Sequence, residues 1–90
     1  MLIQPVQPVN VLIKIGESEY IGQLLSLSEE KLELKCEEYI EKDIEVAFFA
    51  KHFRGQAIIE EIQFARSFFT YQLTIQEIQF QPGLLINTRL

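Results

Sequence analysis

Residues that could act as a nucleophile or a general base are scarce in this chain, which has one cysteine, Cys36, and one histidine, His52. Nucleophilic catalysis needs a Ser or Cys beside a base that a third group orients. Cys36 falls on the apolar side of an alternating segment, a pattern typical of a buried, unreactive thiol. His52 stands between Lys51 and Phe53 at the junction of two predicted strands, where we expect a solvated turn residue rather than a base. Neither residue predicts a catalytic site.

Adjacent acidic residues could do acid–base chemistry or bind a hard cation, and they occur at positions 29 and 30, 37 and 38, and 60 and 61. Neighbouring residues of a strand point to opposite faces of a sheet, so we expect each pair to be solvated. No spacing of His and Cys matches a zinc site. The four glycines stand singly, which excludes a glycine-rich phosphate loop. We therefore expect no enzyme activity, no metal and no cofactor.

Aromatic residues crowd the second half of the chain, close to its only local basic group, residues 51–54. Consecutive pairs such as Phe48 and Phe49, or Phe68 and Phe69, point to both faces of a strand, so one member of each is predicted to be exposed. Exposed aromatic side chains near arginine are typical of protein interfaces. The alternative is a second small core beneath residues 84–90. The predicted interface residues are His52, Phe53, Arg54, Phe68, Phe69 and Tyr71.

A hydrophobic period of two predicts the elements that position these side chains. The expected strands cover residues 9–15, 20–27, 32–36, 44–50, 53–64 and 68–78. The connections are short and no long amphipathic helix separates the strands. Closure into a barrel is favoured because it removes exposed strand edges. The predicted fold class is all-β, a small six-stranded antiparallel β-barrel.

Particular residues predict the connections. Gly16 favours a hairpin turn, and Gly55 suggests a bulge or bend within a strand. Residues 37–43 are predicted to form a loop with an apolar plug at Tyr39 and Ile40, with a single helical turn as one form of it. Residues 82–83, Pro-Gly, predict a type II turn after the last strand.

Ninety residues fill one domain, which divides by pattern into three parts. Residues 1–8, with Pro5 and Pro8, form an extended N-terminal arm, and residues 9–80 form the barrel. Residues 81–90 form a C-terminal tail. Because four of its last seven residues are apolar, we expect the tail to pack on the barrel or on a partner.

Charge and composition restrict the partners and the compartment. Eight Lys and Arg against thirteen Asp and Glu give a net charge of −5, which opposes binding to a nucleic-acid polymer. The longest apolar run, residues 46–50, is far shorter than the roughly twenty residues of a membrane span. The first residues lack the pattern of a secretory signal, and a single cysteine allows no internal disulfide. We expect a cytoplasmic protein that does not insert into a membrane.

The order of features across residues 9–80 resembles a PilZ domain. Residues 20–28 form a strand with a polar end, a one-sided strand and an acidic loop follow, and residues 43–49 precede two final strands. In bacteria this small barrel reads the second messenger cyclic di-GMP, through an arginine-rich RxxxR segment and a DxSxxG motif. The second motif maps onto residues 26–31, where Ser28 matches, but Ser26 replaces the aspartate and Lys31 the glycine. The first motif has no counterpart, because residues 4–8 contain no arginine.

The missing arginines bear directly on ligand binding. Two lost charge-assisted contacts, each worth about 1.5–3 kcal/mol, weaken nucleotide binding by roughly two to four decades. The resemblance therefore implies a degenerate PilZ domain, in which Ser28 is a vestige and the function is contact with another protein. Such partners belong to pilus or flagellar machinery or to cyclic di-GMP signalling. The strand order also resembles the nucleotide-free barrel that precedes the PilZ domain in flagellar-brake proteins.

Two alternatives stay open beside this adaptor hypothesis. One is a cyclic di-GMP receptor with a non-standard site built from Ser28, Arg54 or Arg66. The other is single-stranded nucleic-acid binding through Phe53, Tyr71 and Arg54, which the net charge opposes. The sequence also leaves open whether two copies pair as a homodimer.

Overall fold

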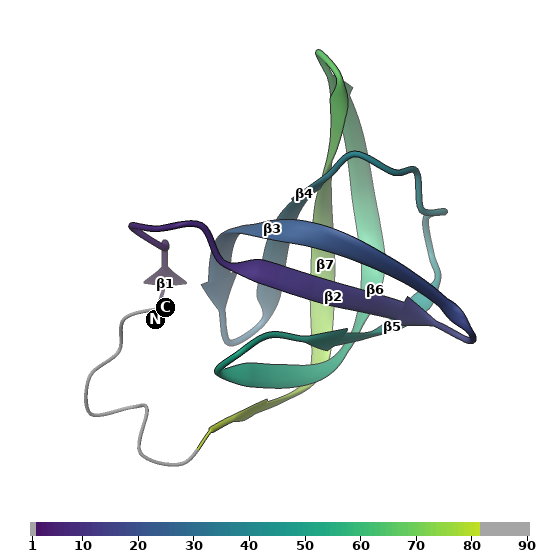
Figure 1. The fold of residues 1–90 in the computed structure, drawn as a ribbon. Coiled ribbons are helices and arrows are strands. Elements are labelled where there is room, and N and C mark those ends of the chain that lie inside the picture. The colour runs from purple at the N-terminus through teal and green to yellow at the C-terminus, as the bar shows by residue number, and fades with distance from the viewer. Residues whose placement is uncertain (1, 82–90) are drawn as a thin grey trace.

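A computed structural model describes residues 2–81, in which all regular structure is β (Figure 1). Six strands close into an antiparallel barrel in the order β3-β2-β5-β6-β7-β4, and β4 pairs back to β3. The short strand β1 pairs with the C-terminal end of β3. The predicted fold class is confirmed. The strands are β1 (Leu2–Ile3), β2 (Asn10–Ile15), β3 (Ser18–Ser28), β4 (Lys31–Cys36), β5 (Glu45–Phe49), β6 (Phe53–Ala65) and β7 (Phe68–Phe80).

Alternation along each strand sends one face into a single core. β4 shows it most clearly, with Leu32, Leu34 and Cys36 buried and the intervening residues half-exposed. Register shifts keep the apolar residues of the longer strands inward. One lies in β3 between Leu24 and Ser26, one in β7 between Ile75 and Glu77, and one in β6 between Ile59 and Glu61. Each fully buried Leu, Ile or Phe side chain contributes about 1.5–3 kcal/mol relative to exposure, so this core accounts for the closure.

Tight turns join the hairpins. Gly16 has φ 59° in the two-residue turn between β2 and β3, as predicted from its lack of a side chain. The β6–β7 turn is equally short, but there Arg66 adopts φ 61°. A non-glycine residue in this region costs about 1–2 kcal/mol, which the long β6–β7 ladder offsets.

Two details of the predicted connections are wrong. Residues 37–43 contain no helical turn, although Ile40 is buried as the expected apolar plug. Gly55 is directly paired with Ile78 rather than bulged, and the register shift follows it. A Cβ atom at Gly55 would clash with the backbone carbonyl of Glu77 and lie 2.8 Å from Cζ of Phe48. Close approach of the neighbouring backbone, not a bend, therefore explains this glycine.

The segment before β2 contains β1 and a bend at residues 6–7. Leu2 and Ile3 lie opposite Ser28 and Leu27 of β3, and the N–H of Leu24 donates to the carbonyl of Val9. The predicted type II turn at residues 82–83 and the predicted docking of the tail lie outside the described residues.

Candidate functional site

The six predicted interface residues divide between the two ends of the β6–β7 hairpin. Phe53 pairs with Phe80 at one end, and Ala65 pairs with Phe68 beside the turn at the other. Two of the six belong to the core: Phe53 is 3% exposed and Tyr71 is 1% exposed. Their rings cannot touch a partner or stack on a nucleobase, which corrects the expectation for these two residues.

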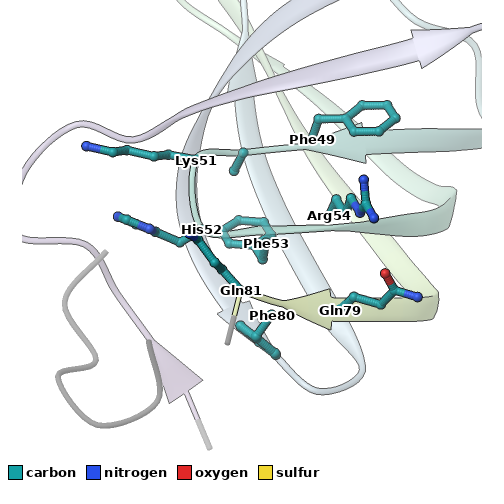
Figure 2. Close-up of a pocket in the computed structure, with 9 residues that line it drawn as sticks. Phe49, Lys51, His52, Phe53, Arg54, Gln79, Phe80 and Gln81 are labelled. Carbon is teal, nitrogen blue, oxygen red and sulfur yellow. The ribbon is translucent and has the colours of Figure 1, made fainter. Parts of the chain in front are cut away.

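A groove of about 660 Å³ lies at the first end (Figure 2). Phe49, Arg54 and Gln79 lie side by side on three neighbouring strands at its rim. His52 is half-buried, and its Nδ1 is buried without a hydrogen-bond partner among residues 2–81. The carbonyl of His52 accepts a 2.9 Å bond from the N–H of Gln81, the last described residue.

Three aromatic side chains form a cluster at the opposite end, which we call the aromatic cluster: Tyr39, Phe64 and Phe69. Phe64 is 64% exposed, Tyr39 is 58% exposed, and Phe69 between them is half-buried. The Phe69 ring centroid lies 4.8 Å from that of Phe64 and 5.5 Å from that of Tyr39. Such tilted and edge-on packing holds the rings in place beyond their burial. The cluster is a preordered apolar surface in contact with solvent.

The position of the hairpin explains why this surface is exposed. β6 and β7 have 13 residues each, whereas β4 and β5 have six and five. The hairpin therefore extends past the rest of the barrel, as its projecting tip shows in Figure 1. Phe64 lies on the same face as Tyr71 and Phe69, but among the described strands none stands opposite it at the projecting tip.

Tyr71 anchors the loop that contributes Tyr39. Its hydroxyl accepts a 2.7 Å hydrogen bond from the N–H of Ile40 and donates a 2.8 Å bond to the carbonyl of Glu38. Burial raises the pKa of the Tyr71 phenol. Both flanking residues of Tyr39 are thus fixed to β7, so its ring is held beside Phe69.

The other face of the hairpin tip carries Phe68. Its ring is half-buried, and the ammonium of Lys35 lies 4.8 Å from the ring centroid. Nearby, the thiol of Cys36 is buried and donates to the carbonyl of Ile21 at 3.3 Å. Burial raises the pKa of this thiol, so the predicted buried, unreactive cysteine is confirmed in its location and supported in its chemistry.

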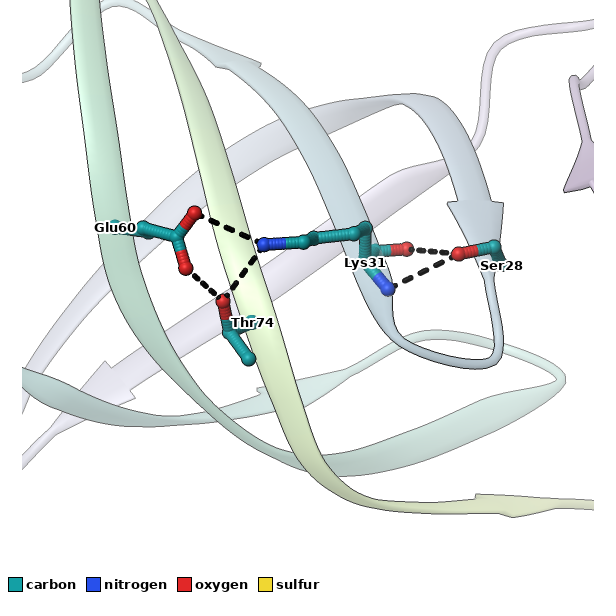
Figure 3. A network of polar contacts seen from close by, with 4 residues as sticks. All are labelled: Ser28, Lys31, Glu60 and Thr74. Atoms are coloured by element: carbon teal, nitrogen blue, oxygen red, sulfur yellow. Dashed lines mark hydrogen bonds and ion pairs between the residues drawn. The ribbon is translucent and has the colours of Figure 1, made fainter.

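Ser28 and Lys31, at the turn between β3 and β4, are used by the protein's own contacts (Figure 3). Ser28 Oγ accepts from the backbone N–H of Lys31 at 3.0 Å and of Glu30 at 3.3 Å, which closes the β3–β4 turn. The ammonium of Lys31 reaches Glu60 at 2.9 Å and Thr74 Oγ1 at 3.1 Å. A hydrogen bond from Thr74 and then the contacts with Lys31 hold the pKa of Glu60 below its usual value. The one cation at this turn is therefore already paired with a carboxylate.

The two arginines proposed for a non-standard nucleotide site are far apart. Arg54 is the second residue of β6, and Arg66 follows the last residue of the same strand. One small ligand cannot contact both of them. Neither belongs to the β3–β4 turn that holds Ser28.

Residues 2–81 contain no group of three or more His, Cys, Asp or Glu side chains arranged to hold a metal ion. No helix in this part of the chain has the length and hydrophobicity to cross a membrane.

Sequence reasoning missed two of the three aromatic-cluster residues, Tyr39 and Phe64, and found Phe69. Tyr39 was treated as part of an apolar plug, whereas only Ile40 fills that role. A usable signal for Phe64 was the length of its strand, since a strand several residues longer than its neighbours must extend beyond them.

No family model matches the sequence, and neither does any curated protein. Among solved structures, the fold is similar to that of the Bacillus subtilis inhibitor of motility (MotI/DgrA), with a TM-score of 0.69 and 11% sequence identity. The match covers 88% of this chain and 43% of the other, so the chain spans less than half the length of that protein. At this identity the likeness concerns the fold, and it fits the PilZ-like barrel expected from the sequence. The chain thus has the closed six-stranded barrel found in one part of a motility inhibitor.

Proposed function

We propose that this chain is a non-catalytic protein-interaction domain of degenerate PilZ type, acting in bacterial type IV pilus, flagellar or related cyclic di-GMP signalling. The aromatic cluster carries the proposal. Two aromatic rings more than half exposed, packed on a third, resemble the aromatic anchors that dominate protein interfaces. The name of the structurally similar protein, an inhibitor of motility, supports the choice of pathway.

The surroundings of the cluster favour a partner surface with an apolar centre and basic residues around it. The loop of residues 37–43, which contains Tyr39, also carries four exposed carboxylates and one lysine. Opposite charges at an interface rim speed association and set specificity. Of the residues predicted from the sequence, Phe69 belongs to the proposed interface as part of the aromatic cluster, and Phe68 belongs to it from the reverse face of the hairpin. His52 and Arg54 line the groove at the other end and have no role in the proposed interface.

Ligand-independent action is supported by the β3–β4 turn. Ser28 is used to close that turn, and the Lys31 ammonium is paired with Glu60. A nucleotide phosphate would have to displace this ion pair to use the lysine. Calorimetric titration with cyclic di-GMP should give no binding heat at high micromolar nucleotide, and a clear isotherm would overturn this part of the proposal.

Site-specific photo-crosslinking tests the contact itself. Phe64 is replaced by the photo-reactive p-benzoylphenylalanine, and the matched control carries it at Phe49, a partly exposed phenylalanine at the other end of the barrel. We expect irradiation in motile bacteria expressing the protein to yield a discrete crosslinked protein from position 64 and not from position 49. Phe64→Ser should remove capture in a competing pull-down, while Phe49→Ser should retain it. Equal capture by both variants would remove the aromatic cluster from consideration.

A further inference from the structure

One edge of β6 is unpaired near the hairpin tip. β5 pairs only with residues 54–58 of β6, and the last backbone bonds on that side join Ile59 to Asp43 and Ile44, at 2.8 and 3.1 Å. From residue 61 to residue 65, β6 pairs with β7 alone among the described residues. We call residues 61–65 the β6 edge. A free strand edge is a template for pairing with another strand.

The alternation of the ladder shows which backbone groups face outward. The N–H of Ile75 bonds to the carbonyl of Glu30 on the β4 side, so the odd residues of β7 point toward β4 and the even ones toward β6. Thr70 and Gln72 therefore exchange bonds with Gln63 and Glu61. The N–H and C=O groups of Ile62 and Phe64 are left pointing away from β7, toward the open side.

We propose that two copies of this chain associate through their β6 edges, antiparallel, about a two-fold axis at Gln63. In that register Ile62 lies opposite Phe64 of the second copy and exchanges both backbone bonds with it, and the reverse pair forms by symmetry. An axis at residue 64 would instead set Ile62 opposite the turn residue Arg66, and an axis at residue 62 would set Phe64 opposite Glu60 in the bulge. Both alternatives pair an apolar side chain with a charged one.

Side-chain chemistry supports a second copy as the occupant. The Ile62–Phe64 pair joins an aliphatic to an aromatic side chain on one face, a favourable cross-strand combination. At the ends of the pairing, exposed Arg66 of each copy comes next to the acidic residues 60–61 of the other. The β6 edge is thus complementary to itself in the side chains that it pairs and in the charges that it brings together. Pairing the β6 edges of two copies uses both of these edges, so the assembly closes as a dimer.

Gln63 provides the test, because the axis places it opposite its own copy. Its side chain is exposed on the outer face of the hairpin, beside Thr70 and Gln72, and not on the face of the aromatic cluster. In a non-hydrogen-bonded antiparallel pair the two Cβ atoms are about 5 Å apart. Two like charges that also come about 5 Å apart weaken association about fourfold at the dielectric constant of water.

The experiment is analytical ultracentrifugation of the full chain at low ionic strength. The protein concentration is varied between about 10 µM and about 1 mM, the range in which so small an interface should associate. We expect a monomer–dimer equilibrium for the wild type. Gln63→Lys and Gln63→Glu should each dimerise about fourfold more weakly, despite their opposite charges. An equimolar mixture of the two should associate about sixteenfold more tightly than either alone, since repulsion is replaced by attraction.

Matched controls are Gln56→Lys and Gln56→Glu, which place the same charges at an exposed glutamine of β6 that is already paired with Ala47 of β5. These variants should dimerise like the wild type. A wild-type monomer throughout the range would overturn the inference. Dimers that are indifferent to both Gln63 substitutions would also overturn it, because the contact would then lie elsewhere. The Gln63 and Gln56 variants leave Phe64 unchanged, so they test the dimer alone. A photo-crosslink from position 64 to a second copy would support the dimer, whereas a crosslink to a different protein would support the proposed function.

Discussion

Removing the hydroxyl of Tyr71 tests how the barrel holds the loop that carries Tyr39 of the aromatic cluster. Tyr71→Phe keeps the buried ring but leaves the N–H of Ile40 without its 2.7 Å partner and the carbonyl of Glu38 without its 2.8 Å partner. A buried backbone group left unsatisfied costs about 1–3 kcal/mol. We expect a loss of about 2 kcal/mol in the free energy of unfolding, which lowers Tm by roughly 8–16 °C in a domain of this size.

Urea denaturation of the two proteins at neutral pH measures the loss, with Tyr39→Phe as the control. Tyr39 lies between the two backbone partners of Tyr71, but its own ring is largely exposed, so its hydroxyl should matter by less than about 0.5 kcal/mol. The loop should also lose its fixed position in the Tyr71→Phe protein, seen as faster amide exchange at Ile40. If Tyr71→Phe loses no more stability than Tyr39→Phe, the reasoning about the loop anchor is refuted.

The same residue predicts a pH dependence at the alkaline end. Burial raises the pKa of Tyr71 above its usual 10.0, so the unfolded chain gives up this proton at lower pH than the folded chain does. The stability of the wild type should therefore fall as pH rises above 10.0 toward the folded pKa. Tyr71→Phe should lack this component of the decline.

Other substitutions test the packing and the charges. Gly55→Ala should cost about 1–3 kcal/mol in urea unfolding, because its methyl group meets the carbonyl of Glu77, whereas Gly22→Ala, with 3.4 Å of space, should change stability by less than about 1 kcal/mol. The pKa of Glu60 is lowered by the contacts in Figure 3, so the stability advantage of wild type over Glu60→Gln should be present at pH 7 and decline as the pH falls below 4.5, through the folded pKa. Equal acid unfolding curves for these two proteins would contradict that assignment. Cys36 should react with a thiol reagent slowly at pH 8 and quickly in urea, since burial both raises its pKa and blocks access.

The strands could be predicted from the sequence because each has one face in the core and one in water. β4 is the clearest case, and its predicted and observed limits differ by one residue. The loop of residues 37–43 could not be predicted in detail, since its shape depends on a bond between Ile40 and Tyr71, 31 residues away. The reason for Gly55 also depends on a distant contact, with Glu77 on the neighbouring strand.

The candidate site was harder to predict than the fold. Strict alternation from Phe53 would place Phe64 on the outer face of β6, but the register shift between Ile59 and Glu61 turns it to the face of Tyr71 and Phe69, and its burial then depends on whether another strand stands opposite. Phe53 lies on the same strand and is buried. Its ring centroid is 6.0 Å from that of buried Phe48 on the neighbouring strand β5. The two phenylalanines differ in their neighbours and not in their local pattern. Strand pairing, which is non-local, decided the difference.

Because the strands differ in length, the residues that form the core are largely distinct from the residues exposed at the tip of the β6–β7 hairpin. The last residues of β6 and the first of β7 contribute few side chains to the core, so this tip can change in sequence while the barrel stays the same. A lineage could thus acquire new specificities by altering one hairpin. An engineer could do the same by exchanging residues 61–70 between barrels of matching register.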